Sequence, residues 1–212
     1  MSIINNLLGS DSGELLIKGL SSQIGQSKSQ TNHLMSMAIP VLLKAMQRNS
    51  NSKEGASGLL SAISNKHDGS ILNKLENVFT GTESTDLEKD GEKILGHVLG
   101  QRQQNIQNAL SIQSGIDNTS VSRVLKMAAP VVMGLLGKQQ REQNASNTDE
   151  NGISNTLMSL VGAASENNNQ SFFESILDAD NDGSIIDDVA DVISGKKKNG
   201  IAGVFGKLFN KN

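Results

Sequence analysis

The chain has 212 residues and a formal net charge of −3, with five phenylalanines and no cysteine, tryptophan or tyrosine. These numbers exclude disulfides, thiolate metal sites and cysteine nucleophiles, and they argue against an aromatic platform for bases or sugars. The mild acidity offers no electrostatic footprint for nucleic acid, while a hydrophobic content of 36% can form a core in one domain or two small ones.

The first residues, MSIINNLLGSDSGE, lack the basic and apolar regions of a secretory signal. The longest apolar run, MAAPVVMGLL at 127–136, is about half of the ~20 residues needed to cross a bilayer. We therefore expect a cytoplasmic protein.

Helical periodicity is the main secondary-structure signal. Leu, Ile, Met and Ala recur at i, i+3 and i+4, and no stretch alternates as a half-buried strand would. The pattern predicts an all-α fold of about ten short helices. Asp11 or Ser12 is the predicted cap of a helix over 14–24, which Gly25 ends. Ser84 or Thr85 is predicted to begin a helical stretch that runs to Gly100. Thr119 or Ser120 is predicted to begin the helix that carries Arg123.

An internal repeat relates two parts of the chain. Residues 20–46 align with 110–136 at a constant offset of ninety and without a gap, and DGSI at 68–71 recurs at 182–185. Such repeats indicate supersecondary units that pack on one another. We therefore predict two related helical repeat units packed together.

The two predicted units differ in length. Unit 1 spans residues 1–90, and unit 2 spans residues 91–212. The second unit contains two inserts rich in Asn, Gln and Ser, at 138–151 and 164–171. This composition predicts solvated loops.

Pro40 and Pro130 lie inside the most apolar runs of the two units. Because proline lacks an N–H and clashes with the preceding turn, each is expected to begin a new helix or to bend a core helix against its repeat mate. A hinge or a groove for a partner helix is the alternative.

Several short motifs follow one another in a characteristic order. They are LLG near the start, AIPVLLKAM and MAAPVVMGLL around the prolines, GLLSAI followed by DGSIL, and LDADNDGSIIDDV near the end. In this order they resemble the bacterial domain-of-unknown-function 937 family, the YidB-like group. The resemblance covers most of the chain and implies a multihelical fold, and some members have been compared with homeodomain-like units. The family has no agreed biochemical activity, so the resemblance implies no mechanism.

In an acidic loop at 178–188, residues 178–185 fit the first eight positions of a calcium-binding helix–loop–helix. Such a loop uses acids at positions one, three and five, glycine at six and a main-chain carbonyl at seven. The candidate calcium ligands are Asp178, Asp180, Asp182, Ser184 and Asp188.

The acidic loop departs from that pattern at position twelve, where Val189 replaces the bidentate Glu, so that Asp187 or Asp188 would have to close the shell. Two other interpretations stay open. Ser184 can cap a helix with Asp187 in its first turn, or the acids can pair with the lysines that follow. Calcium is the one cofactor that the sequence suggests.

The last residues form a basic tail. Residues 195–212 carry five lysines and no acid, whereas 171–194 carry seven acids and no base. The apolar residues of the tail share one helical face, which is typical of a segment that lies on an anionic membrane or in a partner's groove. Alternatively, this face packs on unit 2.

No catalytic constellation is present, and His33, His67 and His97 lie in no ligand spacing, so we expect them at the surface or at its boundary. The sequence favours a non-enzymatic interaction or scaffold protein that contacts a protein partner, or a second copy of itself, through exposed Leu and Met faces. Docking on a membrane through 195–212 is the second hypothesis. DNA binding is the third and weakest, because its best recognition helix, 120–133, carries only two basic residues, Arg123 and Lys126.

Overall fold

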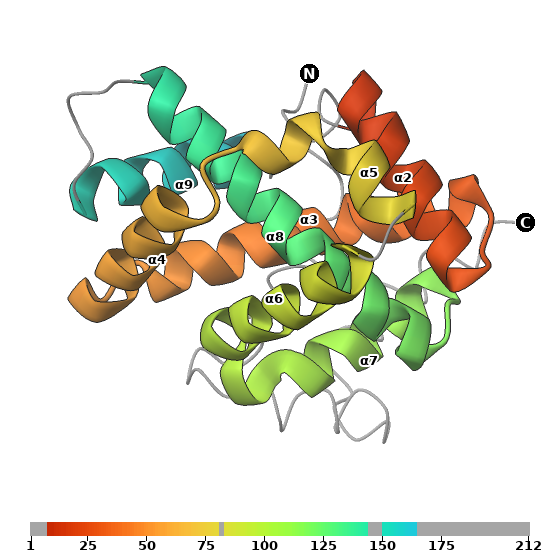
Figure 1. Cartoon of the computed structure of the whole chain (residues 1–212). Coiled ribbons are helices and arrows are strands. Elements are labelled where there is room, and N and C mark those ends of the chain that lie inside the picture. The colour runs from red at the N-terminus through yellow and green to blue at the C-terminus, as the bar shows by residue number, and fades with distance from the viewer. Residues whose placement is uncertain (1–7, 81–82, 144–149, 165–212) are drawn as a thin grey trace, which may run out of the picture.

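The computed structural model describes residues 8–80, 83–143 and 150–164, and these residues form an all-α fold without a strand (Figure 1). They contain eight α-helices and two short 3-10 helices. The elements in chain order are α2 (Asp11–Ile24), α3 (Lys28–Asn49), α4 (Lys53–Asn65), η1 (Ser70–Asn73), α5 (Leu75–Thr80), α6 (Glu83–Val98), η2 (Gly100–Arg102), α7 (Gln103–Ser114), α8 (Asn118–Gln143) and α9 (Glu150–Ala164).

The predicted all-α class is therefore confirmed, but the count of about ten short helices is not. Two of the helices are long, because α3 has 22 residues and α8 has 26.

The two long helices form the centre of the molecule. Each is buried on almost every side over its middle turns: Leu34 to Leu43 in α3 and Val124 to Gly137 in α8 contribute few exposed side chains. In Figure 1, α8 crosses in front of α3, with α4 and α9 at one end of the pair, α2 and α5 at the other, and α6 and α7 alongside. The most extensive packing is between α6 and α8.

Both prolines lie inside continuous helices. The expectation that each begins a new helix is therefore wrong. Proline in a helix interior removes one hydrogen bond and costs about 3 kcal/mol in isolation. Pro40 and Pro130 lie in fully buried turns, where the packing of apolar neighbours offsets this cost.

The first predicted helix begins and ends close to the expected places. Ser10 is its N-cap, and its hydroxyl accepts a hydrogen bond from the backbone N–H of Gly13 at 3.2 Å. The predicted caps, Asp11 and Ser12, are instead the first residues of the helix. Gly25 ends the helix in the left-handed conformation (φ 66°), which glycine adopts without steric cost.

The caps in front of the two long helices occupy positions ninety residues apart. Ser27 accepts from the backbone N–H of Gln30 at 3.2 Å, and the carboxylate of Asp117 accepts from that of Ser120 at 2.9 Å. Hydrogen bonds from the side chain and backbone of Ser120 lower the pKa of Asp117. The cap of α8 is therefore Asp117 rather than the predicted Thr119 or Ser120.

The first polar insert is partly helical. Residues 138–143 continue α8, and α9 begins at Glu150, so the prediction of a loop over all of 138–151 is wrong at both ends. The second insert lies outside the described residues beyond Ala164. Residues 90 and 91, between the two predicted units, both lie within α6.

Within the described part of the chain, one helix could cross a membrane by length and composition, over Asn118–Glu142 of α8. Of its most apolar window, 78% is buried inside the fold. The core helix of a soluble protein meets the same criterion.

Candidate functional site: two clefts beside helices α6 and α7

The predicted calcium ligands, Asp178, Asp180, Asp182, Ser184 and Asp188, lie outside the described residues, as does the basic tail at 195–212. Among the described residues, no three His, Asp or Glu side chains are grouped so that they could hold a metal ion.

His67 corrects the expectation that all three histidines lie at the surface or its boundary. Its side chain is only 5% exposed, and its Nε2 lies 3.5 Å from Oδ2 of Asp90, which also pairs with Lys66. Burial lowers the pKa of His67; the Asp90 carboxylate opposes this effect and Lys66 adds to it. His33 and His97 are exposed, as expected.

The first DGSI motif forms a tight turn after His67. The Asp68 carboxylate accepts from the backbone N–H of Ser70 at 3.0 Å, and Gly69 adopts φ 96°. Hydrogen bonds from the backbone and hydroxyl of Ser70 lower the pKa of Asp68, and Arg141 of α8, 3.4 Å away, contributes to the same shift. The turn is thus built around Asp68 and tied to α8.

Two glycines of α8 let this turn lie directly on the helix. A Cβ atom at Gly137 would be 2.0 Å from the carbonyl oxygen of His67, and one at Gly134 would be 2.5 Å from Cγ2 of Ile71. The two glycines therefore allow the backbone of the turn to contact α8. Gly96 and Gly100 differ from them, because a Cβ atom at either position would meet no described atom within 4 Å.

The larger of two clefts, the amide cleft, lies where α6, α7 and the start of α8 meet. Its volume is about 470 Å³, and its lining residues are Glu88, Gln104, Gln107, Asn118, Thr119, Ser122, Arg123 and Lys126. This volume falls within the range of small-molecule sites, although such sites are mostly apolar.

The basic residues of the amide cleft are paired with acids. Arg123 Nε lies 2.7 Å from Glu88 Oε1, and the same guanidinium donates to the carbonyl of Gln23 at 2.9 Å. Lys126 Nζ lies 3.2 Å from Glu92 Oε1. Arg123 and Lys126 are the basic residues of the helix considered for DNA recognition, and most of that helix is buried in the core.

The amide groups that line this cleft bond to neighbouring hydroxyl and amide side chains. Gln107 donates to the Ser122 hydroxyl at 3.2 Å, and Asn118 donates to the side-chain oxygen of Asn108, which also accepts from Gln104. Oδ1 of Asn118 is buried without a hydrogen-bond partner among the described residues. The described residues that line the cleft include no histidine, so they place no such base beside its hydroxyls.

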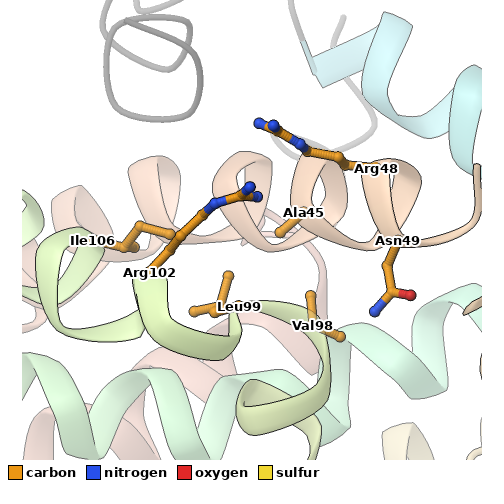
Figure 2. Close-up of a pocket in the computed structure, with 7 residues that line it drawn as sticks. All are labelled: Ala45, Arg48, Asn49, Val98, Leu99, Arg102 and Ile106. Atoms are coloured by element: carbon orange, nitrogen blue, oxygen red, sulfur yellow. The ribbon is translucent and has the colours of Figure 1, made fainter. Parts of the chain in front are cut away.

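The smaller cleft, the arginine cleft, lies between the end of α3 and the α6–η2–α7 junction and has a volume of about 220 Å³. Ala45, Val98, Leu99 and Ile106 provide an apolar floor. Figure 2 shows the guanidinium groups of Arg48 and Arg102 on the same side of the cleft, above that floor.

A hydrogen bond joins the two walls of the arginine cleft. Asn49 at the end of α3 donates from Nδ2 to the carbonyl of His97 in α6 at 2.9 Å. The described lining residues are two arginines, one asparagine and four apolar residues. The cleft therefore combines two arginines at its edge with an apolar floor. The two arginines lie too far apart in the sequence for any motif to have linked them.

A family model described as "bacterial protein of unknown function (DUF937)" matches residues 6–139, which is more than half of the chain. The chain belongs to this family. The match confirms the family predicted from the motif order. Searches of curated proteins and of solved structures found no significant match.

Proposed function

We propose that this DUF937 protein is a non-enzymatic interaction module whose arginine cleft binds an acidic peptide segment that also carries apolar side chains. The observation that supports it is the placement of two guanidinium groups at the edge of an apolar floor. Arginine forms strong, charge-assisted hydrogen bonds with carboxylates. The volume is below the ~300 Å³ of typical small-molecule sites, which favours a few side chains over a cofactor.

The apolar surface supports the same choice of cleft. Among the described residues, the large apolar side chains that remain exposed are Ile112 (68%) and Met158 (62%), on α7 and α9. Two isolated side chains do not form a contiguous docking patch. The Leu and Met faces read from the sequence are largely used inside the core, so a polar-edged cleft is the better surface for a partner.

Peptide binding to the full chain tests the proposal. The probe is a fluorescein-labelled peptide with the sequence of residues 171–182, SFFESILDADND, and the readout is fluorescence anisotropy. We expect Arg48→Glu/Arg102→Glu to weaken binding at least tenfold and Lys18→Glu/Lys28→Glu, which changes the net charge equally at exposed sites, to leave it within twofold. Equal effects of the two pairs would refute the cleft as the binding site.

We also propose that α2–α3 and α7–α8 are equivalent parts of two related units. Three positions ninety residues apart support this: Gly25 and Gly115 end helices with φ 66° and 70°, Ser27 and Asp117 cap the next helices, and Pro40 and Pro130 lie inside them. A chain in which residues 20–46 are replaced by residues 110–136 should remain helical and cooperatively folded, as measured by circular dichroism during urea unfolding.

Calcium binding by the acidic loop remains a second proposal, supported by the spacing of its acids. Titration calorimetry of the full chain with Ca²⁺ tests it, with Asp178→Ala and Asp182→Ala as variants. Heat in the wild type that both variants abolish would support the site, and no heat in the wild type would end the proposal.

The basic tail gives the alternative of a peripheral membrane protein. Co-sedimentation with anionic liposomes of the full chain and of residues 1–194 tests this alternative. Equal sedimentation of the two would rule out docking through 195–212.

A further inference from the structure

We propose that the arginine cleft is occupied by the chain's own acidic segment, residues 171–178 (SFFESILD), in competition with any external partner. This inference rests on the proposed function of that cleft and adds its occupant and its regulation. An intramolecular segment has a high effective concentration, so it would keep the cleft closed to weak acidic partners.

The segment matches the cleft in charge and in polarity. It interleaves two acids, Glu174 and Asp178, with four apolar residues, Phe172, Phe173, Ile176 and Leu177. The cleft offers two guanidinium groups beside an apolar floor. Four of the five phenylalanines of the chain lie beyond residue 171, so the segment can fill an apolar floor that the aliphatic core leaves open.

The segment can reach the cleft from the end of α9. The Ser154 hydroxyl contacts the carbonyl of Ser50 at 3.5 Å, two residues after Arg48. From Ser154, α9 continues for ten residues to Ala164, about 15 Å along its axis. Glu174 lies ten residues further, and ten residues span up to about 33 Å when extended. The carboxylate can therefore return to Arg48 without strain on the chain.

The amide cleft is a weaker candidate for the same segment. Its lining includes an acid, Glu88, which lies 2.7 Å from Arg123. This carboxylate would repel the acids of the segment, whereas the described lining of the arginine cleft includes no acid. The described lining of the amide cleft is also polar throughout, so it offers the phenylalanines no apolar floor. The lysines at 196–198 are the alternative partners of Glu174 and Asp178. The cross-linking experiment below distinguishes pairing with these lysines from pairing with the arginines.

The first experiment compares binding of the labelled 171–182 peptide to the wild-type chain and to Glu174→Lys/Asp178→Lys. If the native segment occupies the cleft, its release should tighten peptide binding at least tenfold, equivalent to about 1.4 kcal/mol. Equal binding to both chains would overturn the intramolecular contact while leaving the proposed function intact. No binding to either chain would instead refute the proposed function itself.

The second experiment detects the contact directly. The chain has no cysteine, so two introduced cysteines can form a disulfide only with each other. The rate of disulfide formation then measures how readily the two sites meet. Gln101→Cys lies next to Arg102, and Ser175→Cys lies between the acids of the segment. The control pair combines Ser175→Cys with Lys18→Cys, an exposed site on α2 at the other end of the bundle from α4 (Figure 1). We expect disulfide formation to be at least tenfold faster in the first pair.

The charge dependence of cross-linking identifies the partner of the acids. Arg48→Glu/Arg102→Glu should remove the rate advantage of the Gln101→Cys pair, whereas charge reversal at Lys196, Lys197 and Lys198 should preserve it. Equal rates in the two cysteine pairs would overturn the proposal. So would a rate that responds to the lysines and not to the arginines, because the acids would then be bound by the tail.

Discussion

The second halves of α3 and α8 have similar sequences but different surroundings. Ninety residues after Lys44 and Gln47 of α3 come Gly134 and Gly137 of α8. Lys44 is exposed, and its ammonium donates to the side chain of Gln47 at 2.9 Å. Both glycines are buried beneath the turn at 67–71.

The difference shows how the residues at two positions decide whether a helix surface is covered. Glycine lets another backbone approach within van der Waals distance, so α8 is covered where α3 meets solvent. The end of α3 presents Arg48 beside the arginine cleft. Both helices therefore contribute to the core, and α3 also supplies one wall of the candidate binding surface.

The largest expected effect comes from the contact between α6 and α8. A Cβ atom at Gly91 would lie 1.6 Å from the carbonyl oxygen of Lys126, so Gly91→Ala must push two backbones apart. We expect it to lower the free energy of unfolding by about 3 kcal/mol. Gly96→Ala, in the same helix with open space around it, should raise it by up to about 1 kcal/mol. Urea unfolding followed by circular dichroism measures both, and equal effects would contradict the close contact.

The turn that covers α8 is tested by substitutions at two positions ninety residues apart. Gly137→Ala places a methyl group 2.0 Å from the carbonyl oxygen of His67 and should cost about 2 kcal/mol of unfolding free energy. Gln47→Ala, ninety residues earlier on the uncovered helix, should change it by less than about 0.5 kcal/mol. The same urea titrations apply. A Gln47→Ala loss as large as that of Gly137→Ala would remove the distinction between the helices.

The buried histidine of this turn predicts a pH dependence. Because burial lowers the folded-state pKa of His67 below 6.5, the unfolded chain takes up its proton first as the pH falls. Stability should therefore be unaffected by His67 well above pH 6.5 and should fall below it, by at most about 1.4 kcal/mol between pH 7.5 and 5.5. The measurement is the difference between wild type and His67→Gln at the two pH values. A difference that does not change with pH would show that His67 is protonated equally in both states.

The smallest effects distinguish the two caps that lie ninety residues apart. Ser27→Ala removes a neutral cap from α3 and should cost about 1 kcal/mol at both pH 7 and pH 3. Asp117→Ala removes a carboxylate whose pKa is lowered by Ser120, and the stability from that carboxylate is lost as the pH falls through its folded-state pKa. Its cost should thus shrink below about pH 3.8, in contrast to that of Ser27→Ala. Unfolding of both variants across this pH range checks the contrast.

Local features of the fold were predictable because they depend on neighbours in the sequence. The helical period of Leu, Ile, Met and Ala indicated the all-α class, and Gly25 marked the end of α2. The predicted N-caps of α2 and α8 differ from the observed ones by one to three residues, because the adjacent Ser, Thr and Asp residues can all cap a helix. Which one caps depends on where the packed helix begins.

The contacts between distant segments were not predictable. Gly91 carries no signal in the sequence for its approach to Lys126, and His67 looked like a surface residue although it is buried against α8 and Asp90. A new helix at each proline was one of two expectations, because proline's local cost is visible in the sequence and the offsetting burial is not.

The sequence by itself determined the helical class, the family, the offset of ninety residues and the segregation of charge near the end of the chain. These are properties of composition, order and short-range periodicity. Only the tertiary structure decided that α8 is covered where α3 is open, and that Arg48 and Arg102 share one cleft. Such pairings depend on how whole helices cross, since the energy of a contact between distant residues exists only after packing has brought them together.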